Sequence, residues 1–137
     1  EKLKKIADHH VAVHSYDYIQ TLVFGDKARS FNHHDDLVQQ HHLTRSHPVT
    51  ARRSLYISPH TISQVVGLTE TDSRAFLDEI YEFASQDELV HQHTWSENDV
   101  VMWDNRCTMH AVAHYDSARH RRVLLRSTIA GDGPVVR

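Results

Sequence analysis

A short segment near the C-terminal end of the sequence carries the residue types best suited to chemistry. It runs Trp103-Asp104-Asn105-Arg106-Cys107-Thr108-Met109-His110, and Arg122 and Arg126 follow it. The imidazole of His110 is a good ligand for a transition metal. An arginine guanidinium pairs with a carboxylate through two parallel hydrogen bonds. The segment therefore predicts a metal ligand beside side chains that can hold an anion.

Strand-like segments are expected to position these residues. Four segments in the C-terminal third have the composition of strands, and they span residues 89–95, 100–103, 106–112 and 122–129. In the first, Leu89, His91, His93 and Trp95 would share one face of the strand. The second is apolar throughout, which favours burial on both faces. Shorter strands are predicted over residues 11–16 and 54–58, after a helix end at residues 1–9.

One helix is predicted clearly, and it starts after Thr69. Thr69 has the character of an N-cap residue, and Asp72 stands where a capping box would have its acidic partner. The apolar residues that follow recur at helical spacing on one face; they are Phe76, Leu77, Ile80, Tyr81 and Ala84. We therefore expect a packing helix of about 16 residues, without a site of its own.

Composition limits the class of protein. The chain has 137 residues, 39% of them hydrophobic, which suits one domain or part of one. Its formal net charge of −3 gives no basic footprint for nucleic acid. Its mean hydropathy is −0.55 and no apolar run is long enough for a membrane span. Cys107 is the single cysteine, so no internal disulfide forms, and a reducing, cytoplasmic setting is expected.

The segment from Asp99 to Arg106, with the His and Arg residues after it, resembles the C-terminal signature of a known enzyme family. This is the taurine dioxygenase / 2,4-dichlorophenoxyacetate dioxygenase (TauD/TfdA) family. Further matches in the family's order are Arg52-Arg53-Ser54-Leu55-Tyr56-Ile57, Val66-Gly67-Leu68 and His93-Thr94-Trp95. The resemblance implies a dioxygenase that uses Fe(II), 2-oxoglutarate and O2. It would hydroxylate a small anionic substrate, a sulfonate or carboxylate such as a taurine-like or aryloxyalkanoate-like compound, and release succinate and CO2.

The resemblance also implies roles for single residues. His110 matches the distal iron-binding histidine, and Arg126 matches the arginine that often faces the anionic group of the substrate. Arg122 is assigned to 2-oxoglutarate because it lies four residues before Arg126, so both share one strand face. Arg121, 11 residues after His110, is the alternative. His60 follows the 54–58 strand, where phenoxyacetate dioxygenases carry a histidine beside the substrate.

The other two iron ligands form a His-x-Asp/Glu motif in the family, and we expect them upstream of residue 1. Two internal matches compete for this role, His33 with Asp35 and His34 with Asp36. These pairs are separated from His110 by fewer residues than the family's motif is from its distal histidine. They are therefore the weaker interpretation. His91 and His93 could share a strand face, but the resemblance makes them ordinary strand residues.

The implied fold is mostly β with helices, the C-terminal portion of a double-stranded β-helix (jelly roll) with one long packing helix. Residues 1–137 would be the C-terminal portion of a single domain, with residues 25–48 as a loop or lid. The predicted strands are fewer than the eight of a closed jelly roll. The expected partner is a small anionic molecule, not nucleic acid or a membrane; homo-oligomers are allowed. The rivals are a non-catalytic histidine-rich metal-binding module, since 14 residues are histidine, and an inactive family fragment.

Overall fold

Short strands and three α-helices make up the regular structure of residues 2–25 and 38–130, which this computed structural model describes. The helices are α1 (Lys2–Ala7), α2 (Tyr16–Phe24) and α3 (Glu70–Ala84), followed by the 3-10 turn η3 (Asp87–Leu89). The strands are β1 (Val11–Ser15), β2 (Val38–His42), β3 (Thr44–Ser46), β4 (Arg53–Leu55) and β5 (Ile62–Val65). None of the described helices has the length and apolar content needed to cross a bilayer.

The centre of the fold is a three-stranded antiparallel sheet with the order β2-β1-β5. Val11 lies opposite His42 at one end of the β1–β2 pair, and Ser15 lies opposite Val38 at the other. Strand β1 is the middle strand, so its residue Ala12 is fully buried. Strands β3 and β4 form a separate antiparallel hairpin, in which Thr44 faces Leu55.

Helix α3 forms as the sequence predicts. The Thr69 hydroxyl accepts a hydrogen bond from the backbone N–H of Asp72 at 3.1 Å and donates one to the Asp72 carboxylate at 2.7 Å. The N-cap is therefore confirmed, and it satisfies a backbone donor that the helix leaves unpaired. Leu77 and Ile80 are fully buried. The hydroxyl of buried Ser73 also bonds to the backbone N–H of Val65 at 3.1 Å, which fixes α3 against β5.

The core lies between α3, the sheet and α1. Its members are hydrophobic residues that are at most 9% exposed, namely Ala7, Ala12, Leu43, Ile57, Ile62, Val65, Leu77 and Ile80. All eight lie within residues 7–80, so the body of the described chain, meaning its helices, sheet and hairpin, comes from the first two thirds of the sequence. Helix α2 packs outside this core, and the Arg74 guanidinium on α3 donates a hydrogen bond to the Tyr18 hydroxyl on α2.

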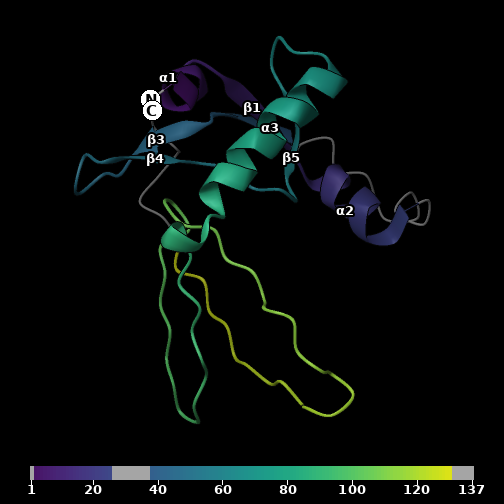
Figure 1. Cartoon of the computed structure of the whole chain (residues 1–137), viewed down its shortest axis with the longest axis vertical. Helices are drawn as coiled ribbons and strands as arrows, with labels where there is room; N and C mark the ends of the chain where they lie inside the picture. The colour runs from purple at the N-terminus through teal and green to yellow at the C-terminus, as the bar shows by residue number, and fades with distance from the viewer. Residues whose placement is uncertain (1, 26–37, 131–137) are drawn as a thin grey trace.

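The four strands predicted over residues 89–95, 100–103, 106–112 and 122–129 are absent from the described residues. These segments form two long excursions that extend away from α3 and the sheet (Figure 1). Val100, expected to be buried, is 90% exposed, and Leu125 is fully exposed. An extended segment becomes a strand only where a neighbour pairs with its backbone groups. Within the described chain no neighbour does so, and the prediction of formed strands is wrong here.

The loop expected over residues 25–48 needs a correction as well. Strands β2 and β3 occupy Val38–His42 and Thr44–Ser46, so the later part of this range belongs to the sheet and the hairpin. Residues 26–37 lie outside the described residues. The mix of strands with a long packing helix agrees with the expected fold class. A closed jelly roll is not formed by the residues that the structure describes.

Candidate functional site

The turn at residues 104–108 is the best-defined feature of the C-terminal third. Asp104 opens it, and its backbone carbonyl accepts hydrogen bonds from the N–H groups of Cys107 and Thr108, both at 3.1 Å. The Thr108 hydroxyl donates to the same carbonyl at 2.7 Å. The Asp104 carboxylate accepts from the backbone N–H of Arg106 at 2.9 Å, a local pattern that Asp favours in turns. The sequence Asp104-Asn105 therefore sets this turn.

Asp104 also forms a two-pronged ion pair with Arg106. The Arg106 Nε lies 2.9 and 3.0 Å from the two carboxylate oxygens, and its Nη2 lies 2.7 Å from Oδ2. The hydrogen bonds from the Arg106 side chain and backbone hold the pKa of the Asp104 carboxyl well below its usual range. Asp104 is consequently ionised at neutral pH, and the pair keeps the turn closed.

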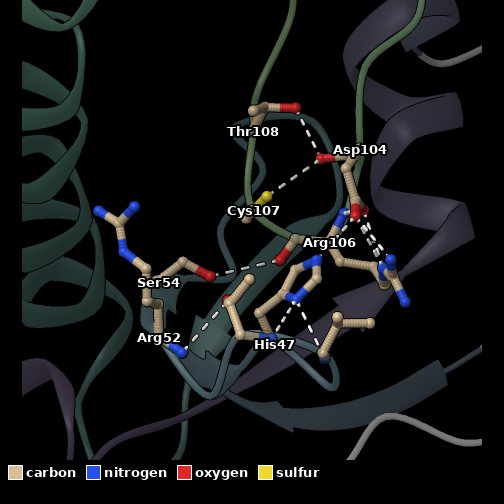
Figure 2. Close-up of polar contacts among 9 residues, drawn as sticks. His47, Arg52, Ser54, Asp104, Arg106, Cys107 and Thr108 are labelled. Carbon is tan, nitrogen blue, oxygen red and sulfur yellow. Dashed lines mark hydrogen bonds and ion pairs between the residues drawn. The ribbon is translucent and has the colours of Figure 1, made fainter.

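The turn is attached to the β3–β4 hairpin through His47 (Figure 2). The His47 Nε2 lies 3.2 Å from Oδ2 of Asp104, although 57 residues separate the two in sequence. The Ser54 hydroxyl on β4 donates a longer hydrogen bond, 3.5 Å, to the Arg106 carbonyl. These two contacts hold the Trp-Asp-Asn-Arg motif against the β3–β4 hairpin. The motif lies where the first excursion ends and the second begins (Figure 1).

His110 follows this turn directly. Its ring lies beside the indole of Trp103, with 4.7 Å between the ring centroids, and its side chain is otherwise exposed. Arg122 and Arg126 lie exposed on the second excursion, and His60 lies exposed in the turn after Ile57. Within the described chain, no hydrogen bond or ion pair joins any of these side chains to another of them. The structure therefore does not gather the predicted site residues at one place.

Metal-ligand candidates are equally dispersed. Across residues 2–25 and 38–130, no three His, Cys, Asp or Glu side chains lie close enough to hold a metal ion. His93 pairs with Asp99 at 3.0 Å in an exposed loop rather than on a strand, and His91 is exposed. The rival pairs His33/Asp35 and His34/Asp36 fall outside the described residues.

A second cluster escaped the sequence analysis. His14 on β1, His41 on β2 and Tyr56 after β4 pack ring against ring, with centroids 5.4 to 5.6 Å apart. They line an open hollow of about 290 Å³ beside the start of α2. The His14 Nδ1 lies 2.9 Å from the Thr61 hydroxyl, and its buried Nε2 has no hydrogen-bond partner in the described part of the chain.

The environment of this cluster favours uncharged imidazole. Burial, and secondly the neighbouring His41, lower the pKa of His14 from 6.5 to about 4. Burial, and secondly Arg45, lower the pKa of His41 as well. Only the alternation of Val11, Val13 and Ser15 with Ala12 and His14 could have placed His14 on one face of a strand. Nothing in the spacing indicates that His41 and Tyr56 would meet it.

Comparison with known proteins gives a consistent result over nearly the whole chain. Residues 1–128 match the family model described as "Taurine catabolism dioxygenase TauD, TfdA family". A (S)-phenoxypropionate/alpha-ketoglutarate-dioxygenase from Sphingobium herbicidovorans is 33% identical over 96% of this chain and 47% of its own length. An alpha-ketoglutarate-dependent 2,4-dichlorophenoxyacetate dioxygenase from Cupriavidus pinatubonensis is 42% identical over 68% of this chain and 32% of its own.

Solved structures agree with the sequence matches. The crystal structure of AAD-2 in complex with Mn(II) and N-oxalylglycine superimposes on 89% of this chain with a TM-score of 0.73 and 33% identity. That overlap covers 48% of the AAD-2 chain. The present chain thus spans about half, or less, of the length of the relatives that it matches.

Proposed function

Because the chain belongs to the TauD/TfdA family of 2-oxoglutarate-dependent dioxygenases, we propose that it forms the C-terminal portion of such an enzyme. The enzyme would hydroxylate a small anionic substrate and couple this to the decarboxylation of 2-oxoglutarate to succinate. The observation that carries the proposal is the family match through the Trp-Asp-Asn-Arg motif, whose turn is closed by Asp104 and followed by His110.

The side chains of this chain supply part of an iron site. We propose that His110 is one iron ligand, since an exposed imidazole is a suitable donor for Fe(II). The donor type fits, but no three donors meet among the residues that the structure describes. The remaining two ligands are proposed to come from a His-x-Asp/Glu motif outside this chain. Bound Fe(II) with 2-oxoglutarate and O2 would supply the oxidising power.

Two arginines are proposed to bind anions. Arg122 would pair with the distal carboxylate of 2-oxoglutarate, and Arg126 would pair with the anionic group of the substrate. Both are exposed and extended in the described chain, so neither guanidinium is committed to a structural ion pair there. His60 is proposed to lie on the substrate side of the site.

The proposed substrate class rests on the substrates that the names of four relatives specify. These are (S)-phenoxypropionate, 2,4-dichlorophenoxyacetate, a sulfonate and a sulfate ester. All of these are small anions, so we propose a small carboxylate, sulfonate or sulfate ester as substrate. We place the enzyme in the cytoplasm, where the exposed thiol of Cys107 stays reduced.

The fold of the complete domain is proposed to be a jelly roll. In it the excursions at residues 90–103 and 109–130 would add strands to sheets completed by another part of the protein. Their composition supports this, because exposed Val100, Met102, Val123 and Leu125 otherwise leave apolar side chains in water.

The decisive experiment measures succinate release with Fe(II), ascorbate, 2-oxoglutarate and a panel of anionic substrates. The chain is assayed alone and extended by the coding sequence that precedes Glu1 in its gene. We expect activity in the extended form and none in residues 1–137 alone. Substrate-dependent succinate release that disappears in the His110→Ala variant supports the proposal.

A histidine-rich metal-binding module is the competing function, and binding assays separate it from the enzyme. A module of that kind would bind several Zn(II) or Ni(II) ions with an affinity that ignores N-oxalylglycine. A dioxygenase would bind one metal ion, more tightly when N-oxalylglycine is present. Metal binding without that coupling in the extended protein would overturn the proposed function.

A further inference from the structure

His47 uses both of its ring nitrogens, and each one serves a different part of the fold. Its Nδ1 accepts hydrogen bonds from the backbone N–H groups of Val49 and Thr50, both at 3.2 Å. Its Nε2 lies 3.2 Å from the Asp104 carboxylate. The His47 side chain is 18% exposed, so it is largely shielded from water at this junction.

These contacts fix the tautomer of His47. A nitrogen that accepts from two backbone N–H groups carries no proton of its own, so the proton of the neutral ring is on Nε2. The Nε2–H therefore donates to the Asp104 carboxylate. In this way the turn between β3 and β4 orients the imidazole, and the imidazole orients the carboxylate.

Asp104 connects His47 to the segment that carries His110. The carboxylate of Asp104 accepts hydrogen bonds from the backbone N–H and the guanidinium of Arg106. The backbone carbonyl of Asp104 accepts one from the N–H of Thr108, two residues before His110. The segments on both sides of this turn have neither helix nor strand. The position of His110 relative to the body thus depends on how the turn is attached to the hairpin.

We propose that His47 is a positioning residue for His110, acting through Asp104 and the turn at residues 104–108. The inference rests on the proposed role of His110 as a metal ligand. Removing a group that orients a metal ligand without touching the metal weakens metal affinity by about 10- to 100-fold. His47 would act in this way although it touches neither the metal nor the substrate.

Two substitutions separate the two nitrogens of His47. His47→Asn keeps an acceptor where Nδ1 lies, so it can still cap Val49 and Thr50, but it is too short to reach Asp104. His47→Gln places an N–H donor near the position of Nε2 and loses the compact cap. A role confined to the β3–β4 turn would be rescued by Asn, whereas the positioning role is rescued by Gln.

The first readout is amide hydrogen exchange at Arg106 and Thr108, followed by NMR in the 137-residue chain. We expect exchange about tenfold faster in His47→Asn, and within about threefold of the parent in His47→Gln, as for the loss of one hydrogen bond. The amide of buried Leu77 in α3 serves as the control for folding and should not change in either variant. Failure of Gln to keep the turn protected, or rescue by Asn, overturns the inference.

The second readout is Mn(II) affinity in the extended protein with 2-oxoglutarate present, measured by electron paramagnetic resonance. We expect about tenfold weaker binding in His47→Asn and nearly unchanged binding in His47→Gln. Equal affinity in both variants would overturn the role of His47. A parent protein that binds no Mn(II) would contradict the proposed function instead, and the exchange comparison would still decide whether His47 positions the turn.

Discussion

The half-buried His14 on β1 leads to a prediction about acid stability. The pKa of His14 falls from 6.5 to about 4 in the folded protein, mainly through burial. Between these two pH values the unfolded chain binds more protons than the folded protein at this position. The free energy of unfolding should therefore decrease as the pH falls from 6.5 towards 4, and His14 should contribute no pH dependence above about 7.

The size of the effect follows from the same two values. The difference between 6.5 and about 4 corresponds to about 3.4 kcal/mol at 1.36 kcal/mol for each pKa unit. His14 is only partly buried, and solvent screening reduces this figure. We expect a loss of about 1–2 kcal/mol between pH 7 and pH 4.5 that arises from His14 alone.

The assay is urea unfolding of the parent chain and of His14→Gln at a series of pH values from 4.5 to 7.5. Glutamine does not titrate, so the stability difference between the two proteins isolates the proton uptake of His14. We expect that the advantage of the parent shrinks by about 1–2 kcal/mol as the pH is lowered. His91→Gln, at an exposed position, is the matched control for replacing a histidine by glutamine. A stability difference that stays constant across the pH range would refute the reasoning.

Three further predictions concern the site and the long helix. In the extended protein, His110→Ala should abolish iron-dependent succinate release while the far-ultraviolet circular dichroism stays unchanged; turnover near the parent rate would remove His110 from the ligand set. Arg122→Ala should raise the Kd for 2-oxoglutarate about 30- to 1000-fold, as expected for the loss of a charge-assisted pair worth about 2–4 kcal/mol. If Arg121→Ala has the larger effect, the assignment of Arg122 to 2-oxoglutarate by its four-residue spacing from Arg126 is wrong. Thr69→Ala should lower the free energy of unfolding by about 1 kcal/mol, measured with urea, since it removes the N-cap of α3; an unchanged midpoint would show that the cap contributes nothing.

The part of the fold that the sequence predicts well is the part that depends on neighbours along the chain. Helix α3 is one example, since Thr69 caps it locally and Leu77 and Ile80 recur at helical spacing. The segments at 100–103 and 122–129 show the opposite case, because their composition predicts strands but cannot supply the neighbour that a strand needs.

The residues of the candidate site likewise fall into those that local sequence features identify and those that depend on distant partners. His110, Arg122 and Arg126 were identified from spacing and from a motif, both of which are local properties of the sequence. His47 was missed because its partner Asp104 is 57 residues away, and a hydrogen bond over that separation leaves no periodic trace. His14 was missed because the rings of His41 and Tyr56 reach it only after the sheet has formed.

The second excursion gives this chain a simple probe of assembly. Residues 109–130 are exposed and without strand pairing, and they include Arg119, Arg121, Arg122 and Arg126. Proteases cut exposed, extended chain far faster than paired strands. Trypsin should therefore trim this stretch first and spare the body around α3. Once the excursion pairs within a completed sheet, the same arginines should resist cleavage, so the rate of trypsin cutting reports whether the domain has closed.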